Sequence, residues 1–450
     1  MKQTLGYALL VGGPVLVLLA VLRAGHGLTA PAETFTSAAA HAAAPVDLGK
    51  LFLQLLVLLV CSRAVGMLFR AIRQPQVMGE MVSGILLGPS LLGWAAPGVS
   101  AWLFPVQSLA YLNVLSQVGL ALFMFLVGLS MDHEAIKDQR RAALFASHVS
   151  IAAPFCLGAL VALRLYPRLS GGHVSFTGFA LFMGVAMSVT AFPVLARILR
   201  DRGLMETRLG TLAIACAAVD DATGWCILAY VVAAVRVGQG GTPAWVTAAA
   251  ALGYAAVMLL VVKPVCRAFG RAYKRSGKLS ENALCGLAAL IFASALATEW
   301  AGLHLLFGAF FLGAVMPKTP GLAAHIRERF ESVTVVILLP LFFAYSGMRT
   351  SLGTLHGGLW VDAAMIIAVA VVGKVGGSAV AARVSGLPWR DAAALGILMN
   401  TRGLMELVVL NIGLDIGVIS PPVFSMMVLM AVVTTLLTAP LLGLVYRPSA

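Results

Sequence analysis

The sequence has little charge. Of its 450 residues only 11% are Asp, Glu, Lys or Arg, whereas 60% are hydrophobic, and the mean hydropathy is +0.96. A soluble domain of this size needs far more charge on its surface. We therefore predict an all-α polytopic membrane protein, integral to a lipid bilayer.

Acidic residues and patterned cysteines are also scarce. There are 18 acidic against 31 basic residues, a formal net charge of +13, but the basic residues lie mostly in short loops between apolar runs and not in a nucleic-acid-binding module. The six cysteines have neither metal-ligand spacing nor the pattern of a disulfide framework. We expect no nucleic-acid partner, no cofactor and no enzymatic activity.

What the sequence has in abundance is long apolar runs. Runs of about 17 to 25 residues are long enough to cross a bilayer as helices. The first, Leu5 to Leu22, is expected to be a span, with a cleaved signal peptide as the alternative. Thirteen further spans are predicted, near 48–69, 76–92, 107–131, 142–163, 174–199, 206–236, 244–266, 283–299, 301–316, 332–348, 358–383, 391–414 and 421–445.

The loop charges orient these spans. Alternate loops carry clusters of Arg and Lys, the densest between residues 267 and 278, whereas the opposite loops hold only scattered cations. Cytoplasmic loops are the ones enriched in Arg and Lys. The C-terminus is therefore predicted to be cytoplasmic.

The span count predicts an inverted repeat. Six spans, one linking span and six more mean that the second set starts from the opposite face of the membrane. The second span of each set has a similar pattern of glycines followed by proline, GEMVSGILLGP from Gly79 and GAFFLGAVMP from Gly308. Both sets also have an interrupted fifth span.

The two interruptions are of different kinds. Pro193 is expected to break the first around Thr190, because a proline inside a helix removes a hydrogen bond and clashes with the preceding turn. The second holds Asn400, Arg402 and Gly403. Paired broken helices are a sequence signature of a transporter site at the membrane midplane, the alternative being an ordinary kink and an unrelated glycine.

Two adjacent carboxylates, Asp220 and Asp221, lie near the middle of the sixth span. An aspartate at the centre of a membrane helix costs about 3 kcal/mol on insertion scales. Such a pair predicts a site for water, a proton or a cation. The alternatives are residues solvated in an aqueous groove or a purely structural pair with basic groups.

Few other ionisable residues lie deep in a span. Lys374 lies among glycines, and a buried ammonium group needs a carboxylate, for which Asp220 or Asp221 is the natural partner. Arg402 and Glu406 are four residues apart, so they are expected to pair on one helical face and to support the broken helix.

Several segments resemble the monovalent cation:proton antiporters, specifically their second family, which includes Kef-type proteins, plant cation/proton exchangers and bacterial sodium/proton antiporters. They follow one another in family order, from about residue 48 to 445. They are QVMGEMVSGILLGPSLLG from Gln76, FLVGLSMD ending at Asp132, SVTAFPVLARIL from Ser188, AVDDATGW from Ala218, GKVGGSAVAAR from Gly373 and NTRGLMELVVLNIGL from Asn400.

The resemblance implies an inverted-repeat sodium/proton antiporter fold in which two broken helices cross at the ion site. It implies scaffold and dimerisation spans at 48–131 and 283–348, and core, ion-transport spans at 142–236 and 358–445. Residues 1–47 would be the N-terminal span or signal segment with an external linker, and 244–278 the linking span with a cytoplasmic loop. A homodimer in the bacterial inner membrane is expected.

The resemblance also assigns the site. Asp221 is expected to bind the monovalent cation or the proton, Asp220 to pair with Lys374, and Thr190 and Asn400 to frame the site at the two breaks. Kef-type relatives carry a nucleotide-binding domain after the last span; this sequence ends at Ala450, so nucleotide gating is not expected.

The predicted function is secondary active exchange of sodium or potassium for protons by alternating access. The two acids with a lysine favour electrogenic exchange. The alternative is an electroneutral potassium/proton exchanger in which Lys374 is structural. A cation channel fits less well because the duplication is inverted, and an aspartyl protease needs two facing acids, whereas adjacent helical residues point about 100° apart.

Overall fold

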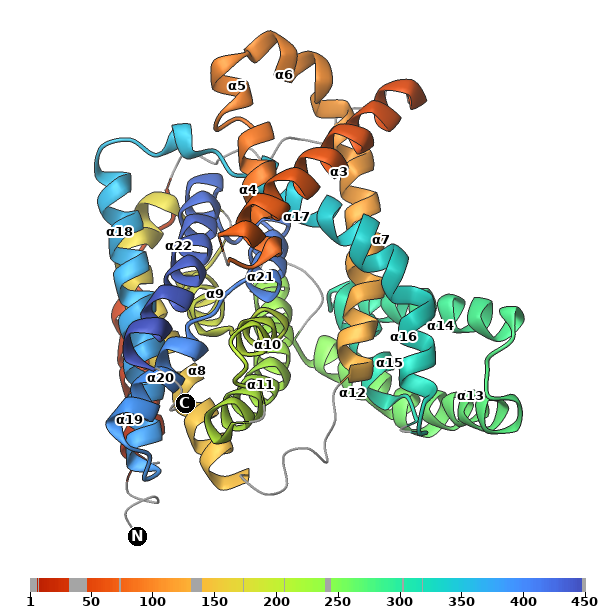
Figure 1. Ribbon diagram of the computed structural model, residues 1–450. Helices are drawn as coiled ribbons and strands as arrows, with labels where there is room; N and C mark the ends of the chain where they lie inside the picture. The colour runs from red at the N-terminus through yellow and green to blue at the C-terminus, as the bar shows by residue number, and fades with distance from the viewer. Residues whose placement is uncertain are drawn as a thin grey trace.

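The computed structural model describes residues 6, 8–31, 47–72, 74–130, 140–172, 174–205, 207–238, 244–301, 303–317 and 319–446. In these residues the regular structure is helical, apart from one isolated bridge between Ser170 and Ile419 (Figure 1). Asp132, at the end of one predicted motif, lies outside the described residues.

The first helices correspond to the N-terminal run and the first predicted set of six spans. Asp47 begins this set by accepting a hydrogen bond from the backbone N–H of Lys50, which caps the first long helix. The elements are η1 (Ala8–Gly12), α2 (Gly13–Gly25), α3 (Leu48–Ala71), α4 (Gln76–Leu87), α5 (Leu92–Ala95), α6 (Pro97–Leu103), α7 (Val106–Ser130), α8 (Arg140–Leu169), α9 (Phe176–Ser188), α10 (Phe192–Asp201) and α11 (Arg208–Gly238).

A linking helix and the second set complete the chain. The linking helix comprises α12 (Ala244–Val257), η2 (Met258–Val262) and α13 (Lys263–Ser276). The second set comprises α14 (Glu281–Trp300), α15 (Leu305–Val315), α16 (Leu322–Val333), η3 (Thr334–Leu338), α17 (Leu339–Met348), η4 (Leu352–Thr354), α18 (Gly358–Val371), η5 (Val372–Gly376), α19 (Gly377–Val384), α20 (Trp389–Met399), α21 (Leu404–Asp415) and α22 (Pro421–Val445).

The number of spans agrees closely with the prediction. In the described residues, eleven helices are long and apolar enough to cross a membrane, and the bent pair α20–α21 makes twelve. Two shorter apolar helices, Leu9–Gly25 and Leu305–Val315, correspond to the N-terminal run and to the ninth predicted span. The N-terminal helix packs against α8 and α9.

The linking span differs from its predicted bounds. Its membrane-length helix covers Leu252–Ser276, about ten residues beyond the predicted end at Cys266. Hydropathy falls at Arg267, but Lys, Arg and Ala are good helix formers, so the helix continues until Gly277 ends it with φ +68°. The basic residues assigned to a loop therefore lie mostly on a helix.

The helices form two bundles joined by the linking helix (Figure 1). The first bundle, which we call the apolar bundle, contains α3, α4, α7 and α14–α17. The second, the charged bundle, contains α8–α11 and α18–α22. Most helix contacts fall within a bundle, and α17 against α21 and η4 against α22 are among the contacts between the two.

Glycines make the helix crossings of the apolar bundle close. A side chain at Gly84 of α4 would overlap the backbone of Ala344 in α17, and one at Gly313 of α15 would overlap the backbone of Phe125 in α7. These crossings relate α4 with α17 to α15 with α7, in the reversed order that an inverted repeat requires. The glycine patterns that suggested the repeat therefore occupy equivalent places.

Candidate functional site

The two predicted breaks meet inside the charged bundle. Helix α9 ends at Ser188 and α10 begins at Phe192, with Val189–Ala191 extended between them. Pro193 lies in the first turn of α10, where its missing N–H is not needed.

The second break lies between α20, which ends at Met399, and α21, which begins at Leu404 with a 43° bend between the two helices. The backbone N–H of Ala191 donates to the carbonyl of Thr401 over 2.9 Å, so the two breaks touch directly. Gly403 lets the second break approach the first, because a side chain there would crowd Val194.

Asp220 is fully buried and surrounded by donors. Its Oδ1 accepts from Ser147 Oγ at 2.5 Å. Its Oδ2 accepts from Thr190 Oγ1 at 2.7 Å, Lys374 Nζ at 3.0 Å and Ser150 Oγ at 3.1 Å. A carboxylate with this many charge-assisted bonds is held in one orientation.

Lys374 is equally well engaged. It lies in η5, a π-helical turn of the kind often found at functional sites. Besides Asp220, its Nζ donates to the backbone carbonyls of Ser150 at 3.0 Å and Ser188 at 2.5 Å. Three acceptors match the three N–H donors of an ammonium group. The pair Asp220–Lys374 is thus a fully satisfied buried ion pair.

Asp221 presents the opposite situation. The next residue along α11, it is 4% exposed, and its Oδ1 has no hydrogen-bond partner among the described residues. The Oδ1 of Asn400, at the second break, is also buried with no partner in the described part of the chain. Buried polar atoms are nearly always satisfied, so each such oxygen needs an explanation, and an unplaced ion or water is one of them.

Arg402 and Glu406 stabilise the first break from the second. Arg402 Nη1 donates to Glu406 Oε2 at 2.6 Å and to the carbonyl of Ala186 at 2.8 Å, and its Nη2 donates to the carbonyl of Met187. Those carbonyls, with that of Ser188, belong to the last turn of α9. A cation at a helix C-terminus offsets the partial negative charge of the unpaired carbonyls.

Sequence reasoning missed the serines. Ser147 and Ser150 on α8 hold Asp220, and Ser188 supplies a carbonyl to Lys374. Ser147 and Ser150 are three residues apart in ASHVS, which places both on one face of the helix, and this spacing could have indicated them. It also missed Thr435 of α22, whose hydroxyl oxygen accepts from the backbone N–H of Arg402 at 2.8 Å.

The other ionisable residues of the spans lie in separate contacts. Buried Asp362 is held by Arg164 and Arg168 at 2.8 and 2.9 Å. Glu299 pairs with Arg236 at 3.1 Å. Both ion pairs lie near the ends of their spans, away from the two breaks, and we interpret them as structural. Glu80 accepts a hydrogen bond from Gln76 at 3.0 Å.

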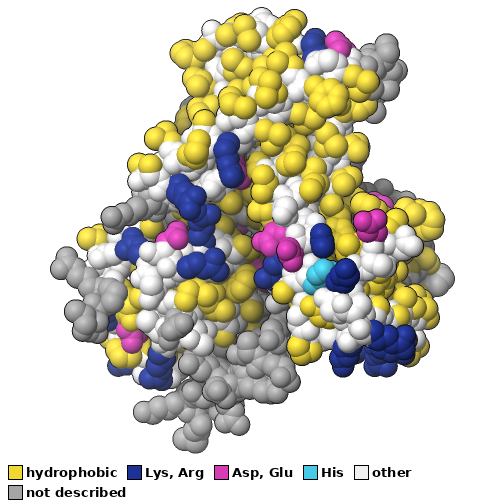
Figure 2. Space-filling model, turned by 45° about the vertical axis from the view of Figure 1, so that its right-hand side comes forward, with side chains coloured by type: hydrophobic (Ala, Val, Ile, Leu, Met, Phe, Trp, Pro, Cys, Tyr) yellow, Lys and Arg dark blue, Asp and Glu magenta, His cyan; other side chains and the backbone are white. Residues whose placement is uncertain are grey.

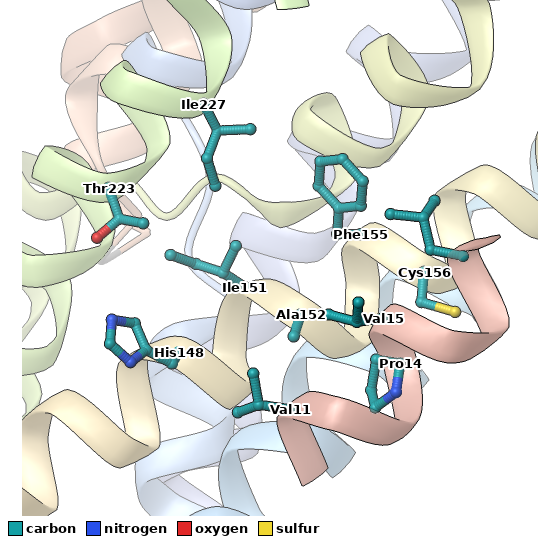
Figure 3. A pocket seen from close by; sticks show the side chains of 11 residues that line it. Val11, Pro14, Val15, His148, Ile151, Ala152, Phe155, Cys156, Thr223 and Ile227 are labelled. Carbon is teal, nitrogen blue, oxygen red and sulfur yellow. The ribbon is translucent and has the colours of Figure 1, made fainter. Parts of the chain in front are cut away.

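An apolar cavity of about 310 Å³ lies between α2, α8 and α11 (Figure 3). Helix α2 contributes Val15, α8 contributes His148 and Phe155, and α11 contributes Thr223 and Ile227. Its walls are mostly hydrocarbon, unlike the polar surroundings of Asp220. The described residues contain no group of three or more His, Cys, Asp or Glu arranged to hold a metal ion. Cation ligands here would be single carboxylate, amide, hydroxyl and carbonyl oxygens.

The sequence and the overall fold are similar to those of known proteins. The family model "Sodium/hydrogen exchanger, transmembrane" matches residues 55–445. The Na⁺/H⁺ antiporter NhaS4 of Synechocystis sp. is 42% identical over 400 residues, 88% of this chain and 97% of that protein. The K⁺/H⁺ antiporter 1 of Saccharomyces cerevisiae is 35% identical over 410 residues, 89% of this chain and 46% of that protein.

Plant relatives and a solved structure extend the comparison. Cation/H⁺ antiporter 17 of Arabidopsis thaliana is 38% identical over 402 residues, 88% of this chain and 48% of that protein. The chain thus spans about half the length of the yeast and plant relatives. The sodium proton antiporter MjNhaP1 of Methanocaldococcus jannaschii has the same fold, with a TM-score of 0.61 at 15% identity over 88% of this chain and 96% of that one.

Proposed function

The chain belongs to the sodium/hydrogen exchanger family, and from that premise we propose that it exchanges a monovalent cation for protons across a membrane. The observation that carries the proposal is the unsatisfied buried Oδ1 of Asp221 beside the crossing breaks. A buried carboxylate of this kind needs either a proton or a cation.

The proposed exchange is a competition for Asp221. A carboxylate holds a proton or a dehydrated cation but not both, so one leaves when the other arrives. Asn400 and Thr190 at the breaks would add oxygen ligands to the cation. Thr190 can do so although its hydrogen is donated to Asp220, because a hydroxyl oxygen keeps lone pairs.

We propose that the charged bundle, residues 142–236 and 358–445, moves as the core against a scaffold formed by residues 48–131 and 283–348, so that the site opens to each side in turn. The small number of helix pairs that connect the two bundles supports this division. We place the linking span, residues 244–278, between the two halves of the repeat.

Electrogenic exchange is proposed on the basis of Lys374. If the pair with Asp220 separates when a cation binds, Lys374 can release a second proton, and exchange of two protons for one cation moves one net charge. The electroneutral alternative keeps a specific support, because all three N–H groups of Lys374 are already bonded.

Further parts of the proposal concern assembly and location. We propose a transporter without enzymatic activity that forms a homodimer in the bacterial inner membrane, with its C-terminus in the cytoplasm. The dense basic segment between residues 267 and 278 supports this orientation.

Transport in proteoliposomes tests the proposal. An imposed pH gradient is followed with an internal pH dye while sodium, potassium or lithium is added in turn. Wild type is expected to move protons in response to at least one cation, and Asp221→Asn is expected to reduce this flux more than about a hundredfold, a loss typical of a residue essential to the reaction. Asp201→Asn, the same change at an exposed acid of α10, serves as the matched control and is expected to behave as wild type.

The charge stoichiometry requires a second measurement. At fixed ion gradients, the net flux depends on the membrane potential and stops at one particular potential if exchange is electrogenic, whereas it is independent of the potential if exchange is electroneutral. A tight wild-type preparation that responds to no monovalent cation would contradict the proposed function itself.

A further inference from the structure

The linking helix carries an unusual distribution of charge. In α13, Lys263, Arg267, Arg271, Lys274 and Arg275 follow one another at spacings of four, four, three and one residues. At 3.6 residues per turn they fall on an arc of about 120°, so they share one face of the helix. All five are exposed, and Figure 2 shows a dense group of Lys and Arg side chains at the lower right, where Figure 1 places α13.

The neighbouring face of α13 is packed against the protein. Cys266 and Gly270 are buried, and a side chain at Gly270 would crowd Thr319. The ring of Tyr273 lies 5.5 Å from that of His325 in α16, centroid to centroid. The basic face is therefore directed away from the bundle, and it cannot rotate inward without breaking this packing.

These cations have no partner among the residues that the structure describes. In the part of the chain that the structure describes, none of the five forms an ion pair or a side-chain hydrogen bond. Other cations of the protein do form ion pairs: Arg164 and Arg168 both bind Asp362. Five like charges on one helical face repel one another, so the face favours an external anion.

The depth of the face in the membrane identifies that anion. Just before it, Leu259, Leu260 and Val261 expose large apolar side chains, as a helix does inside the hydrocarbon core. The headgroup layer is only about 5–7 Å thick on each side of that core. From Lys263 to Arg275 the helix rises about 18 Å, more than the thickness of this layer. The basic face thus follows directly on the exposed apolar residues, and part of it reaches the level of the lipid phosphates.

We propose that the basic face of α13 is a binding site for anionic phospholipid headgroups, in the leaflet that the loop charges identify as cytoplasmic. Basic residues just beyond a membrane helix bind anionic lipids through their phosphate groups. Because α13 belongs to the helix that connects the two halves of the chain, bound lipid anchors this connection at the membrane surface. The proposal does not depend on the chemistry at Asp221.

The test measures lipid binding to the purified full chain in detergent. Thermal unfolding is followed while phosphatidylglycerol, phosphatidylcholine or inorganic phosphate is added, and retained lipids are counted by native mass spectrometry. The test variant is R267Q/R271Q/K274Q. The matched control is R70Q/R200Q/R329Q, which removes the same charge from exposed positions on three different helices.

Phosphatidylglycerol is expected to raise the unfolding temperature of wild type and of the control, and its affinity for the α13 variant is expected to fall about a hundredfold. Three results would overturn the proposal: equal loss in the control, equal protection by phosphatidylcholine, or equal protection by inorganic phosphate. If the α13 variant does not fold, the lipid count on wild type decides, because no preference for phosphatidylglycerol over phosphatidylcholine contradicts the site.

Discussion

The two bundles are stabilised in different ways. The charged bundle buries Asp220, Asp221, Asp362, Lys374, Arg402 and Glu406, whereas Glu80 is the one buried Asp, Glu, Lys or Arg of the apolar bundle in the described residues. The apolar bundle depends instead on close helix crossings at glycines such as Gly84 and Gly313.

This difference is consistent with the proposed division into a rigid scaffold and a moving core. Interlocked glycines allow one arrangement of two helices and resist sliding, which suits a rigid support. Buried charges cost free energy and are retained where they have a function. The contrast indicates that substitutions in the apolar bundle act on stability, whereas those in the charged bundle divide between structural charges and the ion site.

Breaking the ion pair Asp220–Lys374 is expected to have the largest effect on stability. Lys374→Ala leaves Asp220 buried without its cation, a change that typically costs 3–5 kcal/mol. The double variant Asp220→Asn with Lys374→Met is expected to recover much of this loss, because no unpaired charge remains. Thermal unfolding of the purified variants measures both, and a double variant no more stable than Lys374→Ala would contradict the pairing.

In the apolar bundle, Gly84→Ala is expected to destabilise by about 1–3 kcal/mol, because the new methyl group overlaps the backbone of Ala344. Gly286→Ala in α14 is the matched control, since a methyl group there meets open space. It is expected to be neutral or to stabilise by up to about 1 kcal/mol through helix propensity. Equal unfolding temperatures for the two variants would remove the proposed role of the close crossing.

Arg349 forms a contact between the two bundles. Arg349, at the end of α17, donates to Asn411 at 2.8 Å and to Asp415 at 2.6 Å, both on α21. Arg349→Gln is expected to remove about 1 kcal/mol of stabilisation from this partly exposed contact. A loss of this size changes the equilibrium between two positions of the bundles relative to each other by up to about fivefold. The apparent cation affinity in the exchange assay is expected to change by that factor, with the unfolding temperature nearly constant.

The matched control for this change is Arg329→Gln, at an exposed cation of α16. It is expected to leave the apparent affinity unchanged. A similar change in both variants would assign the effect of Arg349 to general electrostatics.

The smallest expected effect concerns pH. In the loop before α15, burial lowers the pKa of His304 to about 4, although the nearby carboxylates Glu299 and Asp415 act in the opposite direction and Arg236 adds to the lowering. The unfolded state binds a proton below about pH 6.5, whereas the folded state does so only below about pH 4. The free energy of unfolding therefore decreases as the pH is lowered from about 6.5 to 4. At pH 5.5 the loss is about 1 kcal/mol relative to pH 7.5.

His304→Gln is expected to remove this part of the pH dependence, which unfolding measured between pH 5 and pH 7.5 would reveal. An unchanged slope would mean that other groups account for it.

Much of the arrangement was predictable from sequence, because its signals are local. Hydropathy located the spans, Pro193 marked the first break, and two midspan acids marked the candidate site. The linking span was predicted too short, because hydropathy falls where the exposed basic residues begin, whereas the helix continues to Ser276.

The hydrogen-bond partners of the charged groups were harder to predict from the sequence. Ser147 and Ser150 bind Asp220 because their face of α8 packs against α11. The local sequence of either helix does not specify which face packs there. Likewise, the pairing of Arg402 with Glu406 follows from their spacing, but its bonds to the end of α9 depend on how the two breaks cross.

The most direct test of the central claim measures proton release on cation binding. Sodium or potassium chloride is added to the purified protein in a weakly buffered solution, with choline chloride as the ionic-strength control, and the pH change is recorded. Cation binding is expected to release protons from wild type and from Asp201→Asn, and none from Asp221→Asn. Cation binding without proton release in wild type, or undiminished release from Asp221→Asn, would contradict it.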